Sequence, residues 1–213
     1  MGWGDASYMG PYIVFQQLTV SALDGTLQPS TIGEGREELR RVGAYLDQVK
    51  EGVAGTPLCP FIEAVHQGGG YWAKLYRVVG NVILDDTRRP ITFDDVATEL
   101  KQAFHYDSKV SGYRKVMDFT KLDIDFIIAA FPDGNTEKFR ANLDEARNRI
   151  RPSFLAEGLM LSQMHVKHSD PQKTGGFVSE IPLLCCRRMH KQDIVFMTTP
   201  EALAAYYKFF PSK

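Results

Sequence analysis

The sequence predicts an α+β fold, with a mixed β-sheet and flanking helices in a single domain. Patterns typical of amphipathic helices alternate along the chain with short apolar runs typical of strands. The length of 213 residues is enough to bury one good core and leaves little for a second. We expect one domain over 34–213, preceded by an N-terminal arm over 1–33, where Gly, Pro, Ser and Thr surround one short apolar stretch.

The first helix and the first strand of the domain follow from residue spacing. Apolar residues recur at helical intervals over 36–49 with charged residues between them, which predicts an amphipathic helix packed on one face. The predicted inward residues are Leu39, Val42, Leu46 and Val49. Aromatic and β-branched residues over 71–79 predict a strand, entered through the three glycines at 68–70.

The second helix should begin at Thr92, because its hydroxyl can accept a free backbone amide while Asp95 occupies the third position of a capping box. Its expected buried stripe is Phe93, Val96, Leu100 and Phe104. The nearly continuous apolar run 124–131 then ends at Pro132. Such a run is typical of a strand covered on both faces, so we expect it at the centre of the sheet.

Helix and strand signals continue to the C-terminus. Asn135 is the expected cap of a third helix, which Pro152 should kink or end before Phe154. Its expected inward residues are Phe139, Leu143, Ala146 and Ile150. Strands are predicted at 159–164 and 181–189. The sequence Thr199-Pro200-Glu201 predicts the start of a last helix, with proline in the first turn.

Composition limits the class of protein. A net charge of -1, with 44% hydrophobic and 24% charged residues, is typical of a soluble globular chain and does not suggest a nucleic-acid partner. The sequence shows no signal peptide and no apolar run long enough for a membrane span. Three cysteines, two of them adjacent, do not form a disulfide framework, so we expect a cytoplasmic protein.

Cys59 is the first candidate site residue, within Leu58-Cys59-Pro60-Phe61. The thiolate is the ligand form of cysteine, and the following proline has no amide donor and steers the chain away from the sulfur. This geometry suits a thiolate ligand to heme iron, although a small buried hydrophobe is the alternative. Cys185 and Cys186 are expected to be structural, with side chains on opposite faces of a strand.

His165 is the second candidate, at the end of a predicted strand that contains Met160 and Met164. That apolar setting suits an axial ligand to heme, and the alternative is a histidine bonded to a backbone carbonyl. Together with His168 and Asp170 it would instead form a zinc or non-heme iron site.

Several further side chains would complete such a site. His66 and Glu63 are candidates for acid/base catalysis, with an ordinary loop histidine as the alternative for His66. The aromatic residues expected to enclose a macrocycle are Phe61, Tyr71 and Trp72. Arg187 and Arg188 would pair with carboxylates such as heme propionates, or else are simply solvated. His105 and His190 carry no signal beyond that of surface residues.

These blocks together resemble a poorly characterised microbial family. They are 58–61, Phe154 through Gly158-Leu159-Met160 to His165, 182–184, 187–189, Asp193 with Phe196, and the helix over 200–207. That family is in turn distantly similar to YqcI/YcgG-type proteins, some of which are heme-dependent N-hydroxylases of arginine or related guanidines and amines. The resemblance covers about residues 55–210 and supports Cys59 and His165. His66, His168, Cys185 and Cys186 lie outside the shared pattern.

The resemblance implies a heme-binding oxidase or monooxygenase of specialised metabolism that oxidises a nitrogen-containing small molecule. In this expectation His165 is the proximal ligand, and Cys59 is the alternative axial ligand. Two other hypotheses stay open: a non-heme metal enzyme that uses His165, His168 and Asp170, with Glu63 as base, and a non-catalytic binding or accessory protein. The expected partner is a small-molecule substrate, without nucleic acid or membrane, and a homodimer is left open.

Overall fold

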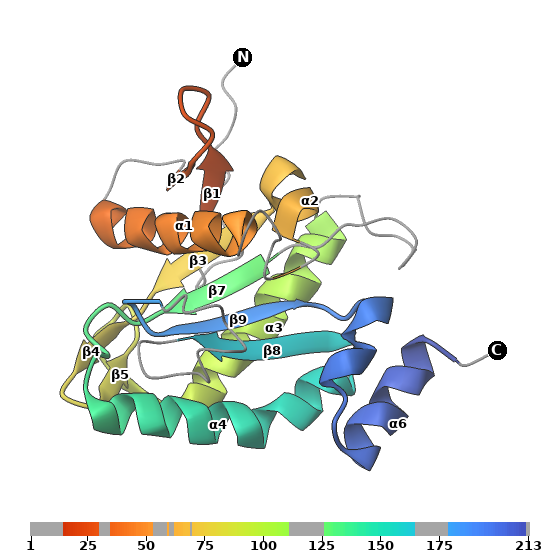
Figure 1. Ribbon diagram of the computed structural model, residues 1–213. Helices are drawn as coiled ribbons and strands as arrows, with labels where there is room; N and C mark the ends of the chain where they lie inside the picture. Colours follow the sequence, from red (N-terminus) through yellow and green to blue (C-terminus); the bar gives the residue numbers. More distant parts are fainter. Residues whose placement is uncertain are drawn as a thin grey trace.

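A computed structural model gives the α+β fold that the sequence predicts (Figure 1). It describes residues 15–29, 35–52, 59, 62–68, 70–110, 126–164 and 179–211. The main sheet has six strands in the order β2-β1-β3-β7-β9-β8, and a small sheet has the order β4-β5-β6. The main strands are β1 (Gln16–Val20), β2 (Leu27–Pro29), β3 (Tyr71–Leu75), β7 (Phe126–Ala130), β8 (Leu159–Met164) and β9 (Leu183–Arg188). The small strands are β4 (Arg77–Val79), β5 (Val82–Leu84) and β6 (Pro90–Ile91).

The central strand is β7, as predicted. It pairs in parallel with β3 and antiparallel with β9, and all five of its residues are buried. The other pairs of the main sheet are antiparallel. An apolar run without alternation is stable here because both faces of the strand are covered.

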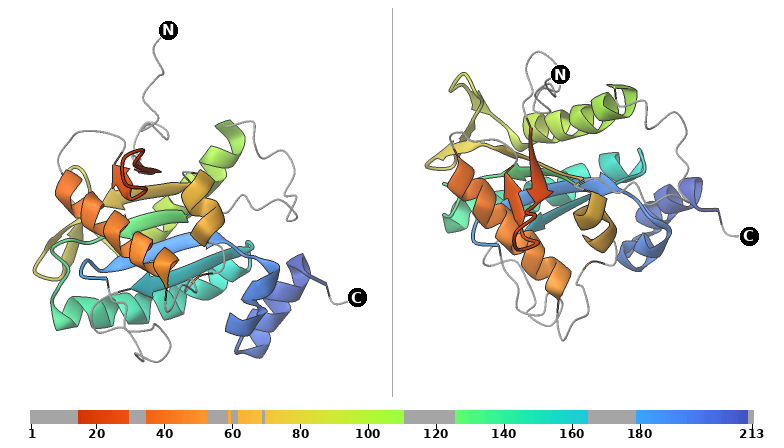
Figure 2. Two further views of the ribbon diagram at one scale, coloured as in Figure 1. Left: turned by 45° about the horizontal axis from the view of Figure 1, so that its top comes forward. Right: turned by 90° about the horizontal axis from the view of Figure 1, so that it is seen from above.

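Helices cover both faces of the main sheet (Figure 2). On one face, α1 (Arg36–Glu51) and α2 (Ile62–Gly68) pack on the sheet and form the α1-side core. On the other, α3 (Phe93–Val110) and α4 (Glu137–Leu155) form the α3-side core. The α1-side core contains Leu18, Leu27, Leu39, Val42, Leu46, Val49, Ile62, Val65, Tyr71, Ala73, Phe126, Ile128, Ala130, Ile181, Leu183 and Cys185. The α3-side core includes Val96, Leu100, Phe104, Ile127, Ala129, Phe131, Phe139, Leu143, Ile150, Phe154, Leu161, Leu184 and Cys186.

Cys185 and Cys186 therefore face opposite cores, which confirms the expectation for adjacent residues of a strand. Both thiols are fully buried, and burial raises the pKa of Cys185 to about 12 and that of Cys186 further. Neither cysteine presents a thiolate at neutral pH, which agrees with the structural role expected for both.

Residues 15–29 lie within the expected N-terminal arm, yet they form part of the sheet. β1 pairs with β3, and β2 extends the sheet to its edge. Phe15, Leu18 and Leu27 are each at most 1% exposed. The arm description is thus corrected for these residues. Short strands carry a weak local signal, and their stability comes from pairing with a distant partner.

The predicted strand over 71–79 is divided between the two sheets. β3 ends at Leu75, and β4 starts at Arg77 in the small sheet. Between them, the buried Tyr76 donates its amide to Ala130 O at 2.8 Å and its hydroxyl to Glu99 at 2.6 Å. These contacts turn the chain from one sheet to the other, and residue composition does not reveal them.

The helix predictions for α1 and α3 are confirmed. All four predicted inward residues of α1 are buried. Thr92 and Asp95 cap α3 reciprocally, with each side chain accepting the other residue's amide. Val96, Leu100 and Phe104 are buried, and Phe93 packs on the same core. Among the described helices, none is long and apolar enough to cross a membrane.

The predictions for α4 need two corrections. Its cap is Thr136, whose hydroxyl accepts the Phe139 amide at 3.0 Å, while Asn135 donates instead to Pro132 O. The helix also continues through Pro152 to Leu155, so of the two predicted effects of Pro152 the end of the helix is wrong, while the kink stays a prediction. Phe154 and Leu155 are buried in the last turn, so their packing offsets the hydrogen bond that proline removes. All four predicted inward residues are buried.

In the C-terminal region, the predicted positions of the two strands and of the last helix are confirmed. β8 has the predicted bounds, β9 lies within 181–189, and α6 (Pro200–Phe209) is capped by Thr199. An additional 3₁₀ helix, η1 (Lys191–Phe196), was not expected. At its start the Asp193 carboxylate accepts the His190 amide, while the His190 ring accepts the Gln192 amide and the His190 carbonyl accepts the Asp193 amide. His190 is thus a half-buried cap rather than only a surface residue.

Candidate functional site

Cys59 lies at the entrance of α2 and faces the α1-side core. Its carbonyl accepts the Ile62 amide at 3.1 Å, and its partly buried side chain packs on that core. Trp72, by contrast, packs on the α3-side core, across the sheet. The structure therefore does not bring Cys59 and Trp72 together around one ligand. Phe61, His165, His168 and Asp170 lie outside the described residues.

Glu63 and His66 lie on the same helix but have different surroundings. The Glu63 carboxylate is exposed and lies 3.8 Å from the Lys50 ammonium. His66 is only 3% exposed, and its Nε2 lies 3.1 Å from Gly25 O. A carbonyl only accepts, so Nε2 carries a proton in this contact.

The second ring nitrogen of His66 faces Asp47. Its Nδ1 lies 3.6 Å from Asp47 Oδ1, and neither atom has a hydrogen-bond partner among the described residues. The other Asp47 oxygen accepts the Leu27 amide at 3.0 Å. His66 and Asp47 thus hold the β1–β2 hairpin against α1 and α2. A catalytic role for His66 would require breaking this contact with the hairpin.

Burial raises the pKa of Asp47 above its ordinary value, against the opposing effects of the Leu27 amide and of His66. A raised pKa in the folded state means that the carboxyl contributes most to stability when protonated. This contribution is present below pH 3.8 and decreases as the pH rises through the folded-state pKa.

We expect Asp47→Asn to be at least as stable as the natural chain at pH 7. The amide oxygen can accept from Leu27, and the amide nitrogen can donate to His66 Nδ1, so both orphaned positions are satisfied. Asp47→Ala should instead cost about 1–2 kcal/mol, because the Leu27 amide loses its acceptor. Urea denaturation from pH 3 to 8 measures both. A loss of stability in Asp47→Asn as large as in Asp47→Ala would contradict the expectation.

Arg187 is turned toward its own chain. Its guanidinium donates to both Asp193 oxygens at 2.7 and 2.5 Å and to Arg188 O at 2.9 Å. Asp193 is fully buried and also accepts the His190 amide. This pair joins the end of β9 to η1. Arg187 thus binds a carboxylate through two parallel hydrogen bonds, as it would bind a heme propionate, but the carboxylate is that of Asp193.

Arg188 does not bind the same carboxylate as Arg187. Consecutive strand residues project to opposite faces, and the Arg188 guanidinium lies 5.2 Å from the centre of the Phe104 ring on the α3 side. The two arginines therefore do not converge on one carboxylate in the described part of the chain.

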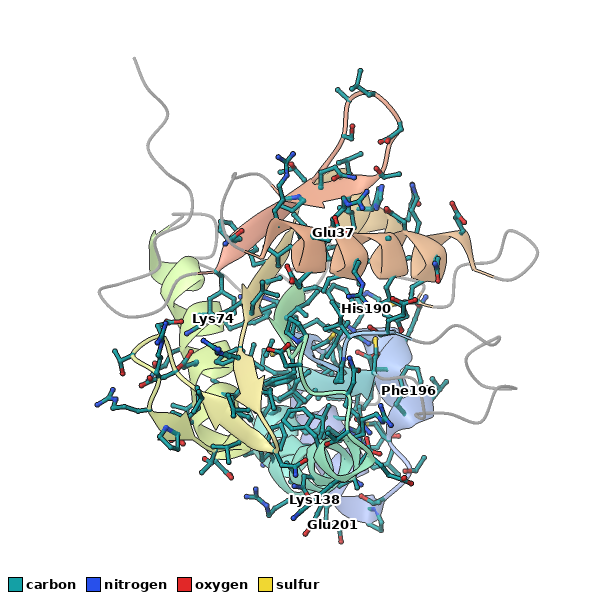
Figure 3. All side chains as sticks on the ribbon, turned by 90° about the vertical axis from the view of Figure 1, so that its left-hand side faces the viewer. Glu37, Lys74, Lys138, His190, Phe196 and Glu201 are labelled. Carbon is teal, nitrogen blue, oxygen red and sulfur yellow. The ribbon has the colours of Figure 1, made fainter. Side chains whose placement is uncertain are left out.

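A charged cluster that the sequence patterns did not predict surrounds the buried Lys74, whose position is labelled in Figure 3. Lys74 is 5% exposed and lies 2.9 Å from Glu99 and 3.0 Å from Asp86. Glu99 also accepts the Tyr76 hydroxyl, and burial together with this carboxylate raises the pKa of Tyr76 well above its ordinary value. The cluster joins β3, α3 and the small sheet. The feature of the sequence that could have predicted this cluster is a lysine within an otherwise apolar and aromatic strand.

Among the described residues, no group of three or more His, Cys, Asp or Glu side chains is arranged to hold a metal ion. The three cysteines, all within the described residues, form no disulfide, and Cys59 alone among them is partly exposed.

Comparison with known proteins identifies the family. A family model described as a domain of unknown function, DUF6875, matches residues 42–213. The chain belongs to this family. The match begins within α1 and includes both blocks singled out in the sequence, around Cys59 and from Gly158 to His165. No curated protein and no solved structure matches the chain.

Proposed function

We propose that this DUF6875 protein binds heme and oxidises a nitrogen-containing small molecule, with Cys59 or His165 as the axial ligand. The setting of Cys59 is the observation that carries the proposal. Its side chain is partly exposed at the edge of an apolar core, whereas the two other thiols are sealed within the sheet. The distant resemblance to YqcI/YcgG-type proteins, drawn from the set of blocks that includes Cys-Pro-Phe, supplies the reaction class.

The surroundings of Cys59 are compatible with a macrocycle on the α1 side. Three further apolar side chains, Tyr45, Leu75 and Met164, pack on the α1-side core while remaining only partly buried, as Cys59 does. A soft thiolate donor beside apolar side chains suits heme iron. Trp72 and Arg187 do not fit the roles first expected of them, because one lies across the sheet and the other is paired with Asp193.

Bound heme would supply an iron that activates oxygen or peroxide. The chain would contribute the thiolate of Cys59 and an apolar surface that excludes water. His66 is a poor candidate for proton transfer in this arrangement, since Gly25 and Asp47 face its two ring nitrogens. An exposed carboxylate such as Glu63 is more accessible to a substrate.

Reconstitution with hemin tests the proposal. We expect a Soret band with about one heme per chain, and its loss or clear shift in either Cys59→Ala or His165→Ala. In the reduced carbon-monoxide complex, the band position distinguishes a thiolate ligand from an imidazole ligand.

Cys186→Ala is the matched control, because it removes a buried thiol that faces the α3-side core, across the sheet from Cys59, and it should keep the band. The proposal fails if the natural chain gives no Soret band, or if the band survives both ligand substitutions unchanged. Zinc or iron at about one per chain without porphyrin, lost in His165→Ala and His168→Ala, would instead favour the non-heme hypothesis.

A further inference from the structure

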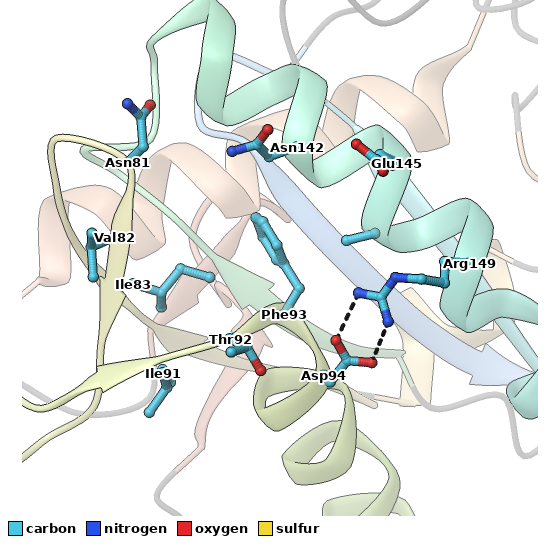
Figure 4. Close-up of a pocket in the computed structure, with 11 residues that line it drawn as sticks. Asn81, Val82, Ile83, Ile91, Thr92, Phe93, Asp94, Asn142, Glu145 and Arg149 are labelled. Carbon is cyan, nitrogen blue, oxygen red and sulfur yellow. Dashed lines mark hydrogen bonds and ion pairs between the residues drawn. The ribbon is translucent and has the colours of Figure 1, made fainter.

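A hollow of about 440 Å³ lies between the small sheet, the first turn of α3 and the middle of α4 (Figure 4). Its volume falls in the range of pockets that hold small organic molecules. It belongs to the α3 side of the main sheet, whereas Cys59 packs on the α1 side. The hollow is thus separate from the proposed heme site.

The hollow has an apolar floor. Ile83 and Ala146 are buried in the α3-side core, and Ile91 and Phe93 pack on that core while remaining partly exposed. Val82, at the mouth, is 46% exposed. A ligand with an apolar or aromatic body would cover these side chains and gain roughly 25 cal/mol for each Å² of apolar surface removed from water.

The wall toward α3 carries a charge pair that is already satisfied. Arg149 donates to both Asp94 oxygens at 2.7 Å, as the dashed lines in Figure 4 show. The fork-to-fork geometry holds both side chains in place. Because each neutralises the other, this pair adds no net charge to the hollow.

The α4 wall, which also carries Arg149, has further polar groups that make no such paired hydrogen bonds. Asn142 and Glu145 lie three residues apart on α4, which places them on one helix face, and neither makes a hydrogen bond within the described part of the chain. Asn81 Oδ1 accepts from Thr136 at 2.7 Å, so the amide nitrogen of Asn81 remains available as a donor. Two carboxylates, Asp94 and Glu145, thus share one guanidinium, Arg149, which leaves the lining with one net negative charge, on the side of Glu145.

We propose that this hollow binds a small amphiphilic amine, whose ammonium group pairs with Glu145 and whose apolar or aromatic body covers Phe93 and Ile83. Asn142, one turn from Glu145, supplies a neutral polar contact beside the ammonium, whereas Asn81 lies at the far end of the hollow, next to Thr136. A carboxylate ligand of the same shape would face the Glu145 charge and is disfavoured. The inference does not depend on heme, because none of these residues belongs to the α1 side.

Amide chemical shifts of the natural chain, titrated with phenethylamine, test this site. We expect saturable changes at residues 91–94 and 142–149, and much weaker changes with 3-phenylpropionate, which has the same ring and the opposite charge. Glu145→Gln should weaken phenethylamine binding about three- to fivefold, the effect of an exposed ion pair. Asn142→Trp should abolish it by filling the hollow.

Glu51→Gln is the control, because Glu51 is also an exposed glutamate, but on α1, across the sheet. It should leave the affinity unchanged. The proposal is overturned if phenethylamine shifts no amide around the hollow, if 3-phenylpropionate binds equally well, or if Glu145→Gln and Glu51→Gln have the same affinity. Heme content is not involved in any of these outcomes, so the two proposals fail independently.

Discussion

Asp193→Ala should cost about 3–5 kcal/mol of unfolding free energy, the largest effect that we expect from a single polar substitution in this chain. Asp193 is fully buried, and it is the carboxylate partner of an Arg187 side chain that is only 11% exposed. Removing it leaves a desolvated guanidinium without its anion and removes the acceptor of the His190 amide. Urea denaturation followed by circular dichroism measures the loss.

Two further variants test whether burial controls the cost of losing Asp193. Asp94→Ala breaks an exposed two-pronged pair with Arg149 and should cost less than about 1 kcal/mol. The double variant Arg187→Met/Asp193→Leu should recover much of the lost stability, because apolar side chains avoid the desolvation of charge. Equal losses in Asp193→Ala and Asp94→Ala would show that burial does not control the strength of the Arg187 pair.

Glu99→Ala should destabilise the fold by roughly 3 kcal/mol, since it leaves both the Lys74 ammonium and the Tyr76 hydroxyl without their main buried partner. Lys74 keeps Asp86, but that side chain is 62% exposed and its charge is screened by water. Chemical denaturation at neutral pH is the measurement.

Asp86→Asn is the matched substitution at the same ammonium, and its expected cost is below about 1 kcal/mol. Glu99→Gln should lie between the two, because it keeps an acceptor for Tyr76 while removing the charge. If Asp86→Asn proves as costly as Glu99→Ala, the exposed carboxylate rather than the buried one stabilises Lys74.

Local sequence signals predicted most helices and the centre of the sheet. The inward residues of α1 repeat every three or four positions, and one face of a helix always follows that spacing. The capping box of Thr92 and the proline after Thr199 act within a single turn, so their effect is visible in a few residues. Cys185 and Cys186 face opposite cores for the same local reason, the alternation of a strand.

The predictions that failed were those in which distant packing outweighs a local signal. Pro152 does not end α4, because Phe154 and Leu155 are buried beyond it. The residues of β1 and β2 offered little apolar pattern: β1 joins the sheet by pairing with β3, more than fifty positions later, and β2 joins it by pairing with β1. Within the candidate site, Cys59 and Trp72 looked like neighbours in sequence, but the alternation of β3 directs Trp72 to the far face.

The sequence by itself determined the fold class, the buried central strand, the helix starts and the identity of its unusual residues, because each of these depends on side chains within one or two turns. Only the tertiary structure decided which polar groups meet. His66 finds Asp47, Lys74 finds Glu99, and Arg187 finds Asp193 once the helices are layered on the sheet. Periodicity reports which face of an element is buried, whereas the partner across that face is set by the packing of the layers.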